Sequence, residues 1–196
     1  MPNWTTNEIR ISGPAEVIKK FLDDAVKKED GTYWFSSWIP VPETISKYDT
    51  TNHPNGKGLV VGQRASWDND SPIVTEELIE EYKRATEEQS RLYGVVGWYD
   101  WNYKYFGCKW DCEVEFYRMD ETELLAVSTT PWCAPEAFFF AMTERYPELE
   151  FQVNAKYEDG GWEDFVFTEG SGQVVASGSW DYDDDEFGDE EEAEQD

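Results

Sequence analysis

The sequence predicts an α+β fold of the ferredoxin-like class, in which the helices cover one face of an antiparallel sheet. Short segments alternate polar and apolar residues, as half-buried strands do, and the stretches after Pro14 and Pro135 repeat apolar residues at helical spacing. Their order is strand, helix, strand, strand, helix, strand, the split βαβ arrangement. We expect one domain over residues 1–180, with a helical insertion at about residues 43–97, extra C-terminal strands, and a disordered acidic tail over residues 181–196.

The first predicted strand and helix lie near the start of the chain. Residues 8–12 alternate polar and apolar side chains, and Gly13 ends the strand. Pro14 suits the first position of a helix whose apolar residues recur at helical spacing: Val17, Ile18, Phe21, Leu22, Ala25 and Val26. We expect Asp30 and Gly31 to end this helix.

The insertion contains one predicted helix, over residues 75–92. Its apolar residues make a narrow stripe of Leu78, Ile79, Tyr82 and Leu92. Two pairs at i,i+4 spacing favour the helix, Glu80 with Arg84 and Glu87 with Arg91. We expect a half-exposed helix packed on the domain and not a second domain.

Regular alternation returns at Trp110 and continues to the end of the domain. Residues 110–117 and 124–129 predict a hairpin, and the helix after Pro135 ends at Pro147. Residues 149–157 show the strictest alternation in the chain. Glycine turns then predict further antiparallel strands through about residue 180.

The predicted sheet leaves one face open, and that face is acidic. If the apolar residues face the helices, the open face carries Glu8, Arg10, Asp111, Glu113, Glu115, Glu150, Gln152, Asn154 and Lys156. RNA-binding domains of this architecture stack bases on aromatic residues there, in a basic setting. This chain has neither their motif nor the sign of their charge, so we predict no direct contact with nucleic acid and take Glu113 and Glu115 as candidate partner contacts.

The net charge of the chain is -27, and residues 181–196 alone hold eleven carboxylates and no lysine or arginine. Such a protein repels phosphate backbones and anionic membranes and attracts basic proteins. The tail is either a solubility extension or an interaction arm. For the arm, the candidate partner contacts are Asp181, Tyr182, Asp183, Asp184, Asp185, Glu186 and Phe187.

A second candidate contact is the aromatic run at residues 98–106. Six of its nine positions are aromatic, more than one strand face can bury. The run either packs in the core or forms an exposed patch for a protein partner, with Trp98 and Trp101 as candidate anchors.

Several chemistries find no support in the sequence. His53 is the single histidine and lies in a turn-like segment, so we predict no catalytic residues, no metal site and no cofactor. The three cysteines are expected to be free thiols, because Cys108 and Cys112 on an extended strand would be separated by about 13 Å. No segment resembles a membrane span or a signal peptide, which predicts a cytoplasmic protein.

Several short motifs are similar to those of the YubB family of ferredoxin-like domains, which plasmids, phages and pathogenicity islands encode. The matching pieces are Pro2-Asn3-Trp4, Ser12-Gly13, residues 35–42, Gly107-Cys108-Lys109-Trp110-Asp111, residues 130–135, Tyr146-Pro147-Glu148-Leu149 and Tyr157-Glu158-Asp159-Gly160. The family usually has W-G-T-K-W where this chain has Phe106 to Trp110, and the acidic tail is not a family trait. The resemblance implies the fold and a mobile-element context, and no catalytic residues.

These observations favour a non-enzymatic, cytoplasmic interaction protein of a phage or other mobile element. Its expected partner is a basic host protein, such as a nucleic-acid-binding defence complex, which it would inhibit or redirect, with nucleic-acid mimicry as one route. Two alternatives are a nucleic-acid-binding establishment factor and a metal-dependent hydrolase that uses paired carboxylates. No membrane partner is expected.

Overall fold

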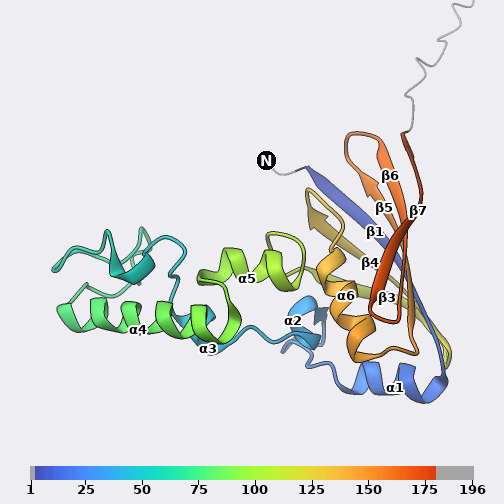
Figure 1. Ribbon diagram of the computed structural model, residues 1–196, viewed down its shortest axis with the longest axis horizontal. Coiled ribbons are helices and arrows are strands. Elements are labelled where there is room, and N and C mark those ends of the chain that lie inside the picture. The colour runs from blue at the N-terminus through green and yellow to red at the C-terminus, as the bar shows by residue number, and fades with distance from the viewer. Residues whose placement is uncertain (1–2, 180–196) are drawn as a thin grey trace, which may run out of the picture.

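The computed structural model describes residues 3–179, and within them the chain forms a mixed α+β fold around an antiparallel sheet (Figure 1). The seven strands of the described part follow the order β2-β3-β4-β1-β5-β6-β7. They are β1 (Trp4–Ser12), β2 (Tyr33–Trp34), β3 (Glu113–Met119), β4 (Glu123–Pro131), β5 (Glu150–Tyr157), β6 (Gly161–Thr168) and β7 (Ser171–Ser179). The helices are α1 (Ala15–Asp23), α2 (Phe35–Trp38), α3 (Glu43–Lys47), η1 (Pro54–Gly56), α4 (Glu76–Tyr93), α5 (Gly97–Tyr105) and α6 (Glu136–Arg145).

The α+β class and the antiparallel sheet were correctly predicted, and the sheet is wider than the four strands of a split βαβ unit. The short strand β2 pairs with β3 at one edge. The hairpin of β6 and β7 extends the other edge from β5. The tail, residues 181–196, lies outside the described residues.

Strand β1 lies at the centre of the sheet and pairs with β4 and β5 along its length. From Thr5 to Ile11 its odd-numbered residues are buried and its even-numbered residues are exposed. Ile9 lies beside Ala126 and Val153 in the neighbouring strands. The alternation predicted for residues 8–12 therefore holds, and the strand begins earlier, at Trp4.

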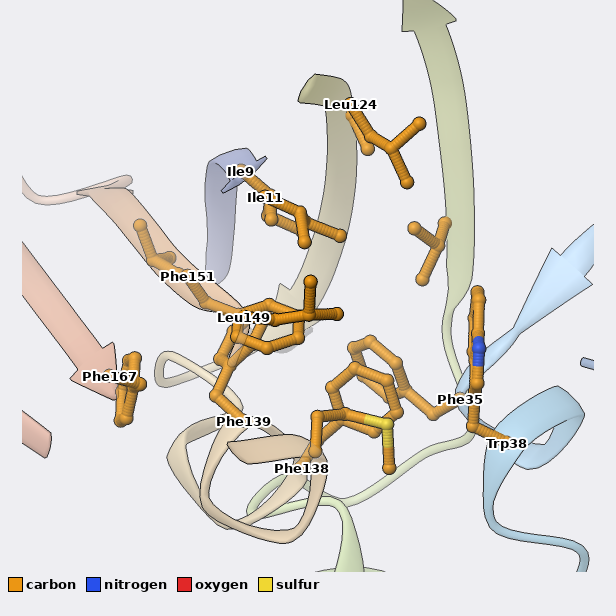
Figure 2. Close-up of a cluster of buried hydrophobic side chains, with 14 of the residues drawn as sticks. Ile9, Ile11, Phe35, Trp38, Leu124, Phe138, Phe139, Leu149, Phe151 and Phe167 are labelled. Atoms are coloured by element: carbon orange, nitrogen blue, oxygen red, sulfur yellow. The ribbon is translucent and has the colours of Figure 1, made fainter. Parts of the chain in front are cut away.

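One hydrophobic core joins the buried face of the sheet to α1, α2 and α6. Figure 2 shows Phe35, Trp38, Phe138 and Phe139 from the helical side against strand and turn residues that include Ile9, Ile11, Leu124, Leu149, Phe151 and Phe167. The Phe139 ring lies 5.7 Å from that of Phe151 and 5.2 Å from that of Phe167. The apolar content of the chain is moderate, and large aromatic side chains supply much of the volume of the core.

Helix α1 ends at Asp23, earlier than the predicted end near Asp30 and Gly31. The Val26 amide donates to the Ser37 carbonyl, 2.9 Å away, in α2. This long-range bond takes a donor that a longer helix would have used within itself. Residues 24–32 accordingly form a connection that leads to β2.

Strand β3 begins at Glu113, and the predicted strand start at Trp110 is wrong. Residues 106–110 form a turn and bends, and the thiols of Cys108 and Cys112 both donate to the Trp110 carbonyl, at 3.2 and 3.4 Å. The separation expected for an extended strand therefore does not apply. Both cysteines are nevertheless free and buried, as predicted.

The insertion forms an arm beside the sheet domain, and Figure 1 shows α3 and α4 beyond α5. Helix α4 begins where predicted, because the Thr75 hydroxyl accepts the Leu78 amide at 3.1 Å. The predicted apolar stripe is partly wrong: Leu92 is exposed, and the helix buries Tyr82, Ala85, Thr86 and Gln89. Glu80 pairs with Lys83 and not with Arg84.

A buried glutamine holds the arm together. The side chain of Gln89 is fully buried, and its Oε1 accepts the Thr50 hydroxyl at 2.6 Å and the Gly97 amide at 2.8 Å. Its Nε2 donates to the Thr44 carbonyl at 2.6 Å. One side chain therefore connects α3, the segment after it and the start of α5.

Candidate partner-binding surface

The open face of the sheet is the face opposite the core, and its predicted polar members come from β1, β3 and β5. Register places Glu8 beside Val127 and Asn154, and Arg10 beside Leu125 and Gln152. The predicted members that the structure places there are Glu8, Arg10, Glu113, Glu115, Glu150, Gln152, Asn154 and Lys156. This result confirms the orientation predicted from two-residue alternation.

Asp111 is the exception, because it precedes β3 and its carboxylate turns to α2. Its Oδ1 accepts the Ser36 amide at 2.9 Å, and its Oδ2 lies 3.5 Å from the ammonium of Lys28. Asp111 is therefore a structural acceptor at the margin of the face.

Ion pairs within the open face cancel much of its positive charge. Arg10 pairs with Glu123, and the Lys156 ammonium lies 2.6 Å from the Glu8 carboxylate. By contrast, Glu113 and Glu115 are exposed, and neither belongs to an ion pair among residues 3–179. Exposed pairs contribute little to stability, yet they remove cations that a phosphate would need. The face therefore presents net negative charge.

The middle of the open face is hollowed by about 500 Å³. Its lining mixes polar and aliphatic side chains from β1, β3, β4, β5, β6 and β7: Glu8, Arg10, Tyr117, Leu125, Gln152, Asn154, Asp164, Val166 and Val175. Asn154 Nδ2 donates to Asp164 Oδ1 at 2.6 Å, which fixes both groups. A lining of this kind suits polar contacts with a protein partner.

A second hollow, of about 670 Å³, lies at the β2–β3 end of the open face, and we name it the tryptophan cleft. Its lining is Trp4, Trp34, Trp110, Asp111, Cys112, Glu113 and Thr129. The Trp110 ring lies 5.6 Å from that of Trp4 and 5.9 Å from that of Trp132. Trp4 is 40% exposed and Trp132 is 44% exposed, so two large apolar rings face solvent.

A polar network positions Trp132 at the margin of the cleft. Trp132 has a φ of 67°, a left-handed conformation that is uncommon for a bulky residue. Its amide donates to the Asn3 carbonyl at 2.8 Å, and the Thr130 hydroxyl donates to the Cys133 carbonyl at 2.6 Å. The buried Asn7 amide group in turn donates to Thr130 Oγ1 at 2.9 Å. The turn is thus fixed from both sides.

The aromatic run, for which the sequence allowed either core packing or an exposed partner patch, is divided between core and surface. It forms helix α5, which the sequence did not predict, and Trp101 is 4% exposed, with its ring 4.0 Å from that of Tyr105. A side chain so buried cannot anchor a partner, so we remove Trp101 from the candidate contacts. Trp98 is half-buried, while Tyr99 and Tyr103 are more exposed, and a hydrogen bond with Tyr99 raises the pKa of Tyr103 to about 12.

The tail residues Asp181, Tyr182, Asp183, Asp184, Asp185, Glu186 and Phe187 lie outside the described residues. Their role as partner contacts stays a prediction.

The cysteines are poorly suited to nucleophilic chemistry. A hydrogen bond with Cys112, together with burial, raises the pKa of the Cys108 thiol, and burial raises that of Cys133. The thiolate is the reactive form, so a raised pKa makes a cysteine inert at neutral pH. Within residues 3–179, no group of three or more His, Cys, Asp or Glu side chains is arranged to hold a metal ion. Across the same part of the chain, no helix has both the length and the apolar character to cross a membrane.

Fold and surface together define an acidic α+β protein with an open sheet face and an aromatic cleft at one end of it. No family model matches the chain, and no curated protein matches it. Among solved structures, it is similar to the crystal structure of a protein api92 from Yersinia pseudotuberculosis, with the family-model description DUF1281. The identity is 10%, the TM-score is 0.49, and the match covers 92% of this chain and 98% of that one.

Proposed function

We propose that the protein is a non-enzymatic interaction protein that binds a basic, nucleic-acid-handling host protein and inhibits or redirects it. The observation that carries the proposal is the charge of the open face. Its cations Arg10 and Lys156 are paired with carboxylates, while Glu113 and Glu115 have no cationic partner among residues 3–179. This face offers carboxylates to a surface rich in lysine and arginine, as a nucleic acid offers phosphates.

Long-range electrostatics support the proposal. Double-stranded DNA carries one negative charge per about 1.7 Å of axis, and a protein with a net charge of -27 competes for the same basic residues. Attraction of this kind mainly raises the association rate, so a protein with this charge would bind and inhibit a basic protein rapidly. The same charge repels nucleic acid itself.

We further propose that the core is ferredoxin-like and that the chain is related to the YubB family of mobile elements. In support, the order β1-α1-β3-β4-α6-β5 and the neighbours β3-β4-β1-β5 fit the split βαβ arrangement. The motif at residues 130–135 has a structural role consistent with this relation, because it forms the Trp132 turn. A mobile-element origin places the protein in the cytoplasm of a bacterial host.

One observation favours a second function, that of a nucleic-acid-binding establishment factor. Trp4 and Trp34 lie at one end of the open face, and single-stranded nucleic acids stack their bases on such rings. The Lys28 ammonium lies over the Trp34 ring, and the Lys109 ammonium lies over the ring of Trp110, which lines the same cleft. We rank this function second because the remainder of the open face is acidic.

The proposal is tested by capture of partners from bacterial host lysate at low and high salt. The test variant is Glu113→Gln with Glu115→Gln, and the matched control is Glu87→Gln with Glu148→Gln, which makes the same charge change at other exposed positions. We expect wild type and control to capture a basic protein and the test variant to capture less. The captured amount should fall at about 300 mM salt, where the Debye length is about 6 Å. Equal capture by all three proteins, or tight binding of the purified protein to nucleic acid, would contradict the proposal.

A further inference from the structure

The tryptophan cleft combines carboxylates with one exposed and two half-buried indole rings, a combination that favours one kind of ligand. Three indoles line it, those of Trp4, Trp34 and Trp110, and Glu113 lies at its margin. Trp34 and Glu113 are paired in adjacent strands, so both side chains belong to the open face. The cleft is therefore continuous with the acidic part of that face.

Cations of the chain itself already lie against these rings. The Lys109 ammonium is 5.2 Å from the centre of the Trp110 ring and 5.3 Å from that of Trp132. The Lys28 ammonium is 5.7 Å from the Trp34 ring. An indole attracts a cation over its face through its quadrupole, and these two lysines show that the cleft does so. No lysine or arginine of the described chain lies over Trp4 in this way.

Two carboxylates that share the cleft or a hydrogen bond with Trp4 belong to no ion pair within residues 3–179, those of Glu113 and Glu158. Glu113 is exposed and belongs to no ion pair within residues 3–179. The Glu158 carboxylate accepts the Trp4 amide at 2.8 Å and is itself exposed. Asp111 differs, because Lys28 already compensates its charge. A cation that enters beside Trp4 thus meets an aromatic face and unpaired carboxylates.

We propose that the tryptophan cleft is a receptor for an arginine side chain on an extended basic segment of the partner. A guanidinium is planar, stacks on an indole and can donate two parallel hydrogen bonds to a carboxylate such as that of Glu113. An ammonium is compact and more strongly hydrated, so lysine is the weaker ligand. The inference rests on the proposed function, since it assumes a basic partner, and it names the side chain that the partner supplies.

Charge complementarity selects this occupant over two others. A neutral proline-rich segment would use the rings and leave Glu113 without a partner. A single-stranded nucleic acid would stack on the same rings but meet the carboxylates of Glu113 and Glu115. Both ligands enter the experiment as competing outcomes.

The test measures peptide binding to the full chain by fluorescence anisotropy. The probes are a peptide of Arg-Gly-Ser repeats, the same peptide with lysine in place of arginine, a neutral proline-rich peptide, and a single-stranded oligothymidine. The cleft variants are Trp4→Ala and Glu113→Gln. The control is Trp67→Ala, which removes a fully exposed tryptophan of the insertion. Melting curves establish that each variant is folded, and Glu113→Gln, a replacement of equal size at an exposed site, serves if Trp4→Ala does not fold.

We expect the arginine peptide to bind most tightly and each cleft variant to weaken it about tenfold, with no change for the control. Unchanged binding by the folded cleft variants would overturn the proposal. The proposal would also be overturned if the proline-rich peptide or the oligothymidine bound more tightly than the arginine peptide and this binding were lost in Trp4→Ala. If a basic host protein is captured independently of Trp4, the proposed function stands and the arginine receptor falls. If the cleft binds the arginine peptide while no basic host protein is captured, the receptor stands and the proposed function falls.

Discussion

Replacement of Gln89 by leucine should destabilise the arm much more than its conservative volume change suggests. The substitution removes the acceptor of the Thr50 hydroxyl and the Gly97 amide and the donor to the Thr44 carbonyl. Leucine fills similar space, so the cavity contribution is small. Each buried polar group left without a partner costs about 1–3 kcal/mol, and we expect a total loss of about 3–5 kcal/mol.

Chemical denaturation followed by circular dichroism gives the total loss, and hydrogen exchange locates it. Exchange should accelerate in α3, α4 and the start of α5, while the amides of β1, β4 and β5 keep their protection, because the arm meets the sheet domain mainly through α5 and α6. The control is Ser90→Ala, an exposed neighbour in the same helix, with an expected change within about 0.5 kcal/mol. A loss below about 1 kcal/mol for Gln89→Leu would refute the reasoning that this amide joins the three segments.

Three further outcomes follow from the structure. In the folded protein at neutral pH, Cys108 and Cys112 should react slowly with iodoacetamide and rapidly after denaturation, as measured by mass spectrometry; rapid reaction of the folded form would contradict their burial and the raised pKa of Cys108. Burial raises the pKa of Tyr146 and Tyr157 above the ordinary 10.0, so above about pH 10 the unfolded chain loses protons that the folded chain keeps, and stability falls as pH rises. Melting temperatures at about pH 8 and 11 check this, and Tyr146→Phe should flatten the decline; an unchanged slope would exclude Tyr146 as a cause. Deletion of residues 181–196 should leave the melting temperature nearly unchanged and slow association with a basic partner at low salt, and equal association rates would make the tail a solubility extension.

Strands and helices that depend on local patterns were predicted well from the sequence. The alternation of β1 and β5 and the prolines before α1 and α6 are visible within a few residues of each element. The end of α1 was not predictable in this way, because the amide of Val26 bonds to Ser37. Helix α5 was missed because its closely spaced aromatic residues satisfy neither the helical nor the strand period alone.

The candidate site was predicted only where it follows from alternation. Glu113 and Glu115 are exposed on the open face, as expected for the polar positions of a strand. The tryptophan cleft was not predicted, because Trp4, Trp34 and Trp110 come from segments far apart in the chain. A weak signal existed, since Trp4 shares the parity of Glu8 in β1 and must therefore share its face.

The most direct test of the central claim is a competition between this protein and DNA for the basic protein that it captures from host lysate. Fluorescence anisotropy of a labelled duplex, bound to that captured protein, reports displacement as the acidic protein is added. We expect displacement by the wild type, weaker displacement by Glu113→Gln with Glu115→Gln, and a decline of the effect with added salt. Continued binding of the duplex at saturating concentrations of the acidic protein would contradict the claim that its carboxylates take the place of nucleic acid.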